Sequence, residues 1–316
     1  MRILVTGGAG FIGSNIVERL LELGHEPVVL DDVSSGYRDN LVAGVAFVEG
    51  DVRSRDAVDA ATERCDVVLH LAASVGNARS IADPLADAAI NVLGTLNVLE
   101  AARARGIKRI VFSSSAGIFG ELKTLPIAED HPQDPDSPYG TSKLAAEKMC
   151  LVYNKLHGMH NVCLRYFNVY GPHQRYDAYG NVIPIFADCI LSGRPLTIYG
   201  DGEQTRDFVN VADVATANIA AALTPGVSGV FNIGSASRIT INDLARVMQA
   251  VSGVEVGVVY APPRQGDVRD SLADITAART AFAYSPAVPI EGRGLQEYMD
   301  WVARDPLTRA RLEAER

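Results

Sequence analysis

Short apolar runs rich in β-branched residues alternate with longer amphipathic segments through the first half of the chain. The run at residues 66–71 (DVVLHL) is almost continuously apolar, a pattern typical of a strand covered on both faces of its sheet. Helical periodicity fills the longer segments, at residues 11–23, 83–105 and 137–157. The alternation predicts an α/β fold, a doubly wound parallel sheet with helices on both faces. Its strands are predicted at residues 2–6, 27–31, 46–49, 66–71, 109–114 and 162–166.

The pattern loosens after about residue 171, where Pro and Gly become frequent and the elements shorten. This change predicts a first domain over residues 1–170 and a smaller α/β substrate-binding region over residues 171–316. We expect the second region to close over the carboxyl ends of the strands. Residues 205–224 within it resemble a regular strand and helix, and we expect them to return to the first domain.

Composition and charge narrow the classes of molecule that this protein could bind. The chain has 316 residues, 47% of them hydrophobic, and a net charge of −9 at pH 7. The excess of acid argues against a nucleic-acid surface and against binding to an anionic membrane. A bound anion must therefore be held by a local cluster of cations. No apolar run approaches the ~20 residues of a membrane span, and no signal-peptide pattern opens the chain. We expect a cytoplasmic protein.

Cysteine and histidine spacing argues against a metal site. None of the four cysteines lies in a C-x-x-C pair, so neither a zinc site nor a disulfide framework is indicated. The only close histidine pair, His157 and His160, flanks Gly158 at a predicted helix end, where solvated or capping roles are favoured. We expect no bound metal, and we interpret the cysteines as buried thiols in a reducing compartment.

A glycine motif at residues 5–13 (VTGGAGFIG) joins the first predicted strand to the first helix. Gly7, Gly10 and Gly13 form a G-x-x-G-x-x-G pattern. Residues without a Cβ let backbone N–H groups approach a pyrophosphate, which then lies at the positive end of the helix. Gly13 allows the helix to pack tightly on the strand. The strand before and the helix after the motif predict a dinucleotide-binding (Rossmann) domain.

The acid at the end of the second predicted strand indicates which dinucleotide binds. A carboxylate at Asp31 accepts hydrogen bonds from the adenosine ribose and repels a 2′-phosphate. Asp32 adds a second negative charge, and the next basic residue is Arg38. NAD is therefore favoured over NADP. Asp51 and Val52 suit the adenine edge, although a helix N-cap role for Asp51 remains open.

A Y-x-x-x-K pair supplies candidate chemistry. Pro138 suits the first turn of a helix capped by Ser137 or Asp136, which puts Tyr139 and Lys143 on one face. Tyrosine has a pKa of ~10, so a base that works near neutral pH needs a shift of ~3 units, or ~4 kcal/mol. The ammonium of Lys143 and the positive nicotinamide ring together are expected to supply that shift.

Three serines end the fifth predicted strand, at residues 113–115, where open α/β sheets place their sites. A hydroxyl at this point could bridge a substrate hydroxyl and Tyr139. Serines at a strand end can also be explained by loop solvation alone, and a Y-x-x-x-K pair can arise by chance. Their occurrence together, after the glycine motif, favours an oxidoreductase-type site.

These residues resemble the extended short-chain dehydrogenases/reductases and, within them, the UDP-glucose 4-epimerase group. The resemblance covers nearly the whole chain and rests on TGGAGFIG (6–13), HLAA (70–73), FSSS (112–115), PYGTSK (138–143), RYFNVYG (165–171), GDGEQTRD (200–207) and RQGD (264–267). The cofactor-binding residues that the glycine motif and the resemblance predict are Gly7, Gly10, Phe11, Ile12, Gly13, Asp31, Asp32, Ser35, Gly36, Asp51, Val52, Leu71, Ala72, Ala73, Ser113, Tyr139, Lys143 and Tyr166.

The resemblance also implies roles in catalysis and substrate binding. Tyr139 is the implied acid/base, Lys143 holds the nicotinamide ribose, and Ser115 orders the proton path. Asn168 meets the phosphosugar, and Tyr199 stacks on uracil with Asn181 and Val182 beside it. Arg206 and Arg264 grip the pyrophosphate, Asp267 holds the uridine ribose, and Ser271 borders the C2 substituent of the sugar. The implied substrate-binding set is Ser115, Tyr139, Asn168, Asn181, Val182, Tyr199, Arg206, Arg264, Asp267 and Ser271.

The residues directly after Ser115 narrow the reaction. Related 4,6-dehydratases and decarboxylases carry acids at this point, whereas this chain has Ala116 and Gly117. The resemblance therefore implies an NAD-dependent UDP-hexose 4-epimerase that works through a 4-keto intermediate. Because Ser271 is small, N-acetylated UDP-hexoses are expected as substrates too, although Asn77 or Arg175 could decide the pocket instead. The resemblance further implies a homodimer built on the helices at residues 83–105 and 137–157.

Other interpretations remain open. Gln174 and Arg175 resemble the loop that offers a cation to the sugar carboxylate in UDP-glucuronate 4-epimerases, although that group tends to carry Thr at the position of Asn168. A catalytically silent NAD-binding regulator would usually lose the Tyr or the Lys, and this chain keeps both. A plain alcohol dehydrogenase with exchangeable cofactor is disfavoured by the uridine-clamp motif.

Overall fold

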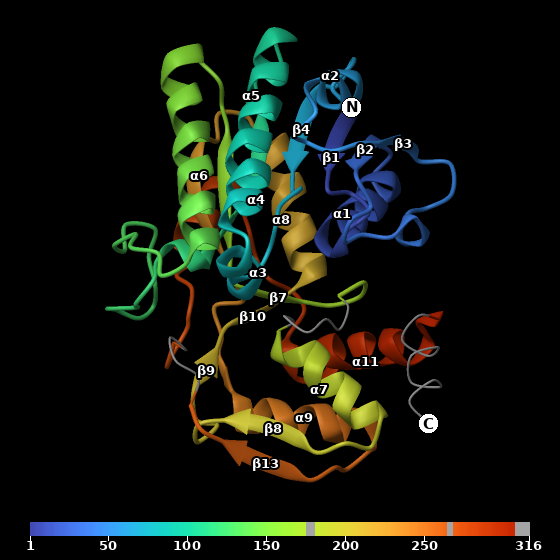
Figure 1. Cartoon of the computed structure of the whole chain (residues 1–316), viewed down its shortest axis with the longest axis vertical. Coiled ribbons are helices and arrows are strands. Elements are labelled where there is room, and N and C mark those ends of the chain that lie inside the picture. Colours follow the sequence, from blue (N-terminus) through green and yellow to red (C-terminus); the bar gives the residue numbers. More distant parts are fainter. Residues whose placement is uncertain (175–180, 264–267, 307–316) are drawn as a thin grey trace.

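The computed structural model of the protein describes residues 1–174, 181–263 and 268–306 (Figure 1). A seven-stranded sheet forms its centre, in the order β11-β6-β5-β4-β1-β2-β3, and every neighbouring pair is parallel. The doubly wound α/β fold predicted from the sequence is confirmed. The strands are β1 (Arg2–Thr6), β2 (Glu26–Asp31), β3 (Ala46–Glu49), β4 (Val67–His70), β5 (Ile110–Ser115), β6 (Val162–Tyr166) and β11 (Gly229–Ile233).

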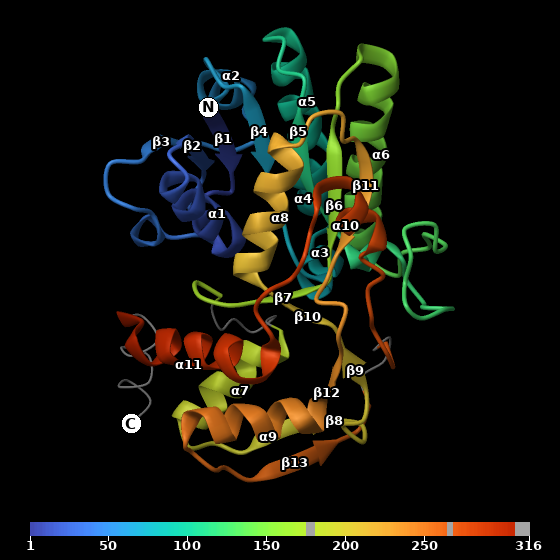
Figure 2. The same cartoon turned by 180° about the vertical axis from the view of Figure 1, so that it is seen from behind.

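Helices cover both faces of the sheet, as the two opposite views show (Figures 1 and 2). Each face has its own apolar core, which explains why the strands are apolar on both sides. The helices on one face are α1 (Phe11–Glu22), α8 (Val211–Leu223) and α10 (Thr276–Phe282). Those on the other face are α2 (Arg55–Ala61), α5 (Thr95–Ala104) and α6 (Pro138–His157).

The strand order changes direction between β1 and β4. The connection from β1 leads to β2 on one side, whereas β4, β5 and β6 follow on the other side. In open parallel sheets this arrangement leaves a crevice at the carboxyl ends of the two strands, where ligands bind. The glycine motif follows β1, and the HLAA segment begins at the end of β4.

A second, smaller unit lies beyond the carboxyl ends of the strands (Figures 1 and 2). It has a separate apolar core, and its sheets are two-stranded, with β8 beside β13. Two short pairings, β7 with β10 and β9 with β12, lie between the units. The elements of this unit and of the two short pairings are α7 (Val182–Leu191), β8 (Leu196–Tyr199), α9 (Ile241–Ser252), β13 (Val258–Ala261), α11 (Leu295–Arg304), β7 (Asn168–Tyr170), β9 (Thr205–Arg206), β10 (Phe208–Asn210) and β12 (Ile239–Thr240).

The chain returns to the central sheet after β10. Helix α8 packs in the same core as α1, and β11 then adds to the edge of the sheet beside β6. Strand β11 was not among the predicted strands. Its sequence, GVFNI, begins with Gly and contains Asn, and both residues weaken a strand pattern. Pairing with β6 therefore stabilises a strand that the local sequence pattern does not predict.

The helix predicted at residues 83–105 is not uniform. It follows the short helix α3 (Asn77–Ala82) and comprises α4 (Pro84–Ala88), a π-helical segment at Ala89–Gly94 and then α5. Asp83 caps α4 by accepting a hydrogen bond from the backbone N–H of Ala86 (2.9 Å). The wider turn at residues 89–94 inserts a bulge, a feature frequent at functional sites.

Among the described residues, one helical stretch is long and apolar enough to cross a membrane, Pro84–Ala104. The prediction from sequence that no such stretch is present was wrong on this point. Its most apolar window has a mean hydropathy of 1.2 and is 44% buried within the protein. Because a helix packed in a protein core has the same properties, this stretch is weak evidence for a membrane span.

Candidate functional site

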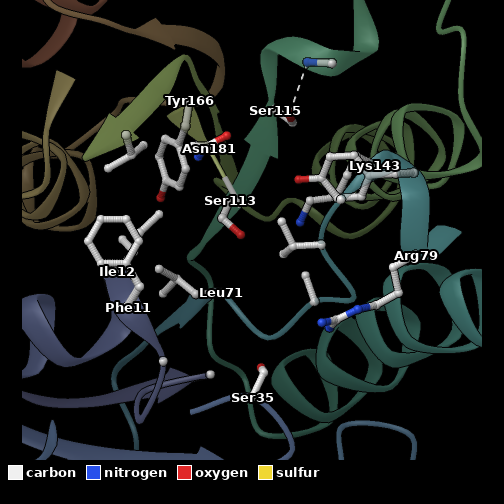
Figure 3. A pocket seen from close by; sticks show the side chains of 18 of the residues that line it. Phe11, Ile12, Ser35, Leu71, Arg79, Ser113, Ser115, Lys143, Tyr166 and Asn181 are labelled. Carbon is white, nitrogen blue, oxygen red and sulfur yellow. Dashed lines mark hydrogen bonds between the residues drawn. The ribbon is translucent and has the colours of Figure 1, made fainter. Parts of the chain in front are cut away.

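A cleft of roughly 1120 Å³ runs along the carboxyl ends of the strands and is lined by both units. Figure 3 shows its wall, with Phe11 and Ile12 on one side, Ser113 near the centre, Ser115 above, and Lys143 and Arg79 opposite Phe11 and Ile12. Most of the residues predicted to bind the cofactor line this cleft. They are Gly7, Gly10, Phe11, Ile12, Gly13, Asp31, Asp32, Ser35, Asp51, Val52, Leu71, Ala72, Ala73, Ser113, Tyr139, Lys143 and Tyr166.

The glycine turn is shaped by close backbone contacts. Gly7 has a φ of 69°, in the left-handed region that favours glycine. A Cβ on Gly7 would lie 2.7 Å from the backbone nitrogen of Ala72, and one on Gly13 would overlap the carbonyl oxygen of Gly7. Helix α1 begins at Phe11, and its N-cap residue, Gly10, offers no side-chain cap. The first N–H groups of α1 therefore remain available to an anion in the cleft, and this cradle fits the pyrophosphate of a dinucleotide.

Asp31 ends β2 at the edge of the cleft. Its carboxylate accepts hydrogen bonds from the backbone N–H groups of Ala9 (2.9 Å) and Val33 (2.8 Å), which tie it to the glycine turn. Burial raises the pKa of Asp31, and these two bonds partly oppose that shift. The nearby Arg38 pairs with Glu49 (2.9 Å). This negative edge suits an unphosphorylated ribose and therefore NAD.

Asp51 and Gly36, both predicted at this end of the cleft, make contacts that the sequence did not show. Asp51 does not cap a helix, because Ser54 caps α2, and the Asp51 carboxylate instead accepts hydrogen bonds from the side chain of Arg53. Gly36 is absent from the residues that line the cleft. A Cβ there would lie 2.6 Å from the backbone of Ala9, so Gly36 lets its loop approach the glycine turn.

The Y-x-x-x-K pair lies in the first turns of α6. Ser137 is the N-cap, and its Oγ accepts a hydrogen bond from the backbone N–H of Gly140 (3.1 Å). Tyr139 is half-buried and hydrogen-bonded to the hydroxyl of Ser115. The Ser115 oxygen also accepts the N–H of Gly117 (3.0 Å), which holds the serine at the strand end. Tyr139, Lys143 and Ser115 are therefore brought together at one point of the cleft.

The pKa of Tyr139 differs from the sequence-based expectation. Burial raises it to about 12, and the hydrogen bond from Ser115 opposes this shift. The expected lowering by Lys143 is not seen in the protein alone, because removing a phenolate from water costs more than the neighbouring groups return. Burial also lowers the pKa of Lys143 to about 8, and its Nζ lies 4.7 Å from the ring centre of Phe112.

The residues predicted to bind the sugar nucleotide do not all line the main cleft, unlike most of those predicted to bind the cofactor. Asn168, Asn181, Arg206 and Ser271 line the main cleft. The Nδ2 of Asn168 donates to the carbonyl of Asp207 (3.0 Å), which ties β7 to the segment after β9. Arg206 Nη1 donates to the carbonyl of Thr205 (2.8 Å).

The other residues predicted for the sugar nucleotide lie elsewhere. Tyr199 lines a second hollow of roughly 480 Å³, which shares Val268 with the main cleft. Val182, predicted beside the uracil, packs against the core of the second unit and does not line the cleft. Arg264 and Asp267 lie outside the described residues, as does Arg175.

Two side chains on the cleft wall, Arg79 and His173, were not predicted from the sequence. Arg79 on α3 points into the cleft (Figure 3). It lies shortly after β4, and that position at the carboxyl end of a parallel strand was the signal available. His173 follows β7, and its Nδ1 lies 2.7 Å from the hydroxyl of Ser14 on α1. Within residues 1–174, 181–263 and 268–306, no group of three or more His, Cys, Asp or Glu side chains could hold a metal.

Comparisons with known proteins agree along almost the whole chain. The model of the NAD dependent epimerase/dehydratase family matches residues 3–234. A putative UDP-glucose 4-epimerase of Methanocaldococcus jannaschii is 38% identical, over 97% of this chain and 100% of the relative. The structure of UDP-glucose 4-epimerase from Thermotoga maritima with UDP-glucose superposes with a TM-score of 0.92 at 37% identity, covering 96% of this chain and 99% of that one.

A third relative is named for an acetylated sugar. The UDP-N-acetylglucosamine 4-epimerase from Methanobrevibacter ruminantium, in complex with UDP-N-acetylmuramic acid, has a TM-score of 0.92 at 34% identity. The match covers 96% of this chain and 98% of that one. Since sequence, fold and cofactor cleft agree over this length, the chain belongs to the NAD-dependent epimerase/dehydratase family.

Proposed function

We propose that this protein is an NAD-dependent 4-epimerase of UDP-hexoses. The observation that carries the proposal is the meeting of Tyr139, Lys143 and Ser115 in a cleft that continues to Arg206. Tyr139 removes the proton from the C4 hydroxyl of the sugar, and Ser115 orders that proton path. The glycine turn and Asp31 would hold NAD, which would supply the reversible hydride acceptor that oxidation at C4 requires.

The residues after Ser115 support epimerisation over elimination. Ala116–Ile118 form a single 3₁₀ turn beside Tyr139 that contains no acid. A Cβ on Gly117 would lie 3.3 Å from the Ser115 hydroxyl and 3.8 Å from the Tyr139 ring. A longer acidic side chain at this position would therefore crowd the proton path. With no acid in this turn to expel a leaving group, reversible oxidation at C4 is the reaction that these residues support.

The protein as purified supplies the test. It should interconvert UDP-glucose and UDP-galactose without added cofactor, followed by NMR of the sugar products. Denatured protein should release NAD, because a reaction that returns its hydride favours a cofactor that stays bound. Protein that is empty and active only with added NADP would contradict the argument from Asp31. If the protein turns over UDP-glucuronate and does not turn over UDP-glucose or UDP-galactose, this would favour a UDP-glucuronate 4-epimerase.

A second candidate substrate is an N-acetylated UDP-hexose. Ser271 is small, 8% exposed and part of the cleft wall, and one structural relative is named for UDP-N-acetylglucosamine. Ser271→Tyr should reduce turnover of UDP-GlcNAc strongly while UDP-glucose turnover stays near the wild-type level, because the added ring fills the space for an acetamide. Ser271→Ala is the matched control and should retain both activities. Failure of the wild type to turn over UDP-GlcNAc would exclude this extension.

We also propose that the protein is a homodimer. Large apolar side chains are exposed along α4, along the π-helical segment that follows it and along α6, and exposed apolar surface of this kind marks interaction sites. They are Leu85 (82%), Leu93 (58%), Met149 (36%), Val152 (40%) and Leu156 (70%). Light scattering should give a dimer mass, and Leu93→Asp should lower it to that of a monomer. Leu23→Asp is the control, since Leu23 is also exposed (46%) but follows α1. A wild-type monomer at micromolar concentration would contradict the proposal.

A further inference from the structure

A buried carboxylate lies beside the catalytic turn, and the function above does not use it. Asp87, in the short helix α4, is 1% exposed. Its Oδ2 accepts a hydrogen bond from Ser142 Oγ (2.5 Å), and its Oδ1 accepts one from Asn91 Nδ2 (3.0 Å). Both donors are neutral groups. Because burying a charge is costly unless another charge compensates it, the position of Asp87 requires an explanation.

The hydrogen bond from Ser142 places Asp87 against the turn of α6 that carries Tyr139 and Lys143. Ser142 lies between Tyr139 and Lys143 in sequence, and its hydroxyl is also 3.0 Å from the carbonyl oxygen of Tyr139. Helix α4 therefore contacts α6 through Asp87 at the turn that carries both catalytic side chains. This hydrogen bond joins α4 to that turn inside the protein.

The π-helical segment after α4 completes the connection. It carries Asn91, whose amide pairs with both backbone groups of Ser74, accepting the N–H (2.9 Å) and donating to the carbonyl (3.0 Å). Ser74 follows the HLAA segment on the cleft wall. Asp87 thus belongs to a buried cluster with Asn91, Ser74 and Ser142, which joins α4, the loop after β4 and α6. Asp87 and Asn91 are four residues apart and lie on one face of this helical stretch.

The charge of Asp87 also acts on the catalytic pair. Lys143 is 3% exposed, and the carboxylate of Asp87 is the largest influence that raises the pKa of Lys143 against the effect of burial. The same carboxylate raises the pKa of Tyr139. The other titratable groups that act on Lys143 are the buried thiols of Cys150 on α6 and Cys163 on β6. His70 on β4 experiences the charge of Lys143 but is itself kept neutral by burial.

We propose that Asp87 is a positioning residue for the Tyr139–Lys143 pair, which holds their turn of α6 through Ser142 and balances the buried charge of Lys143. Its role in turnover rests on the epimerase function proposed above, whereas its effect on the ionisation of Tyr139 does not. A measurement of that ionisation therefore separates failure of this proposal from failure of the proposed function.

The test is Asp87→Asn in the protein as purified with its cofactor. The ultraviolet absorbance of the Tyr139 phenolate is titrated with pH, as the difference from Tyr139→Phe in the same background. Removal of the negative charge should move this titration to lower pH by about 1 unit. The pH profile of kcat should move in the same direction on both limbs, since both Tyr139 and Lys143 lose the same neighbour. An unchanged titration in a folded variant would overturn the proposal.

Two further variants separate the charge from the contact. Asp83→Asn removes an exposed carboxylate at the start of the same helix and retains a good N-cap, so its titration should match the wild type. Ser142→Ala removes the bridging hydroxyl and keeps the charge, so kcat should fall by about tenfold while both limbs stay in place. Wild-type kcat in Ser142→Ala would overturn the positioning role.

If Asp87→Asn does not fold, Asp87→Glu provides the test. It keeps the charge and moves it by one methylene group. A pH profile of kcat whose two limbs stay at the wild-type pH, with a reduced kcat, would support the proposal. Limbs displaced to lower pH despite the retained charge would overturn it.

Discussion

The two halves of the cleft are built in different ways. The cofactor half is made from backbone at the ends of β1, β2 and β4, where a Cβ on Gly7 or Gly13 would strike neighbouring main chain. The sugar half is made from side chains of loops and short strands, among them Asn168, Arg206 and Ser271, which come from distant parts of the sequence. The cofactor half thus has one shape that the backbone imposes, while the sugar half can change its specificity one side chain at a time.

A buried hydrogen-bond chain supports the cofactor half. Thr6 Oγ1 accepts the N–H groups of Leu71 and Ala72 (3.2 Å each) and lies 2.7 Å from His70 Nδ1. The other ring nitrogen of His70 lies 3.0 Å from the hydroxyl of Thr95, which donates to the carbonyl of Asn91 (2.6 Å). These hydrogen bonds thus connect β1 and β4 to α5 and to the π-helical segment that follows α4.

The largest effect is expected where the two halves meet. Tyr139→Phe deletes the acid/base hydroxyl and should lower kcat by about 10²–10⁴-fold or more. Because Tyr139 is half-buried and loses one hydrogen bond, the unfolding free energy should fall by about 1 kcal/mol and the NAD content should stay unchanged. Tyr153→Phe, on the same helix but bonded to Glu100 (2.5 Å), should keep wild-type turnover. Substantial turnover in Tyr139→Phe would remove this residue from the mechanism.

The rigidity of the cofactor half is tested by adding single methyl groups. Gly13→Ala forces a Cβ against the carbonyl of Gly7, where only backbone movement can relieve the overlap. It should lower the unfolding free energy by about 1–3 kcal/mol and release NAD. In Gly10→Ala the nearest atom to the new Cβ is the Gly7 oxygen at 3.3 Å, so stability should stay near the wild type while NAD retention falls. Equal stability losses in both variants, measured by denaturant unfolding, would contradict this account.

Low pH should reduce the free energy of unfolding, because His70, buried beneath the cofactor half, is protonated when the chain unfolds. Burial lowers the pKa of His70 from 6.5 to about 3. Below pH 6.5 the unfolded chain binds a proton that the folded protein excludes, so stability is lost as the pH falls toward 3. The slope is about 1.4 kcal/mol per pH unit. In His70→Gln this slope is absent, so its stability deficit relative to the wild type should shrink by about 2 kcal/mol between pH 7 and pH 5.

Denaturant unfolding at the two pH values measures this effect. His157→Gln changes an exposed imidazole at the end of α6 and should retain the wild-type acid slope. A constant difference between wild type and His70→Gln across this range would show that His70 does not titrate on unfolding.

The smallest effect is expected in the sugar half. Arg206→Gln removes a charged donor from the predicted pyrophosphate site and should raise KM for UDP-hexoses by about tenfold, with NAD content and stability unchanged. Arg246→Gln, an exposed arginine on α9 paired with Asp243 (2.9 Å), is the control and should leave KM at the wild-type value. A KM that does not respond to Arg206→Gln would place the pyrophosphate elsewhere in the cleft.

Features encoded in short stretches of sequence could be predicted without the structure. The strands β1 to β6, the glycine turn and helix α6 with its cap at Ser137 follow from apolar periodicity, glycine spacing and capping residues, which act over a few neighbouring positions. The position of Tyr139 four residues before Lys143 is likewise a local property of a helix. Family membership followed because these local signals occur in one order along the chain.

Features that depend on residues far apart in sequence appeared only in the folded chain. Strand β11 forms because β6 offers an edge, Val182 turns into the core of the second unit, and Gly36 lies against the glycine turn. The raised pKa of Tyr139 depends on burial by several elements at once, and Asp87 meets Ser142 across two helices. The sequence by itself determined the parallel sheet, the dinucleotide turn and the catalytic pair, because each depends on neighbouring residues. Tertiary structure alone decided the ionisation and orientation of that pair, because both depend on which distant groups exclude water and supply charge.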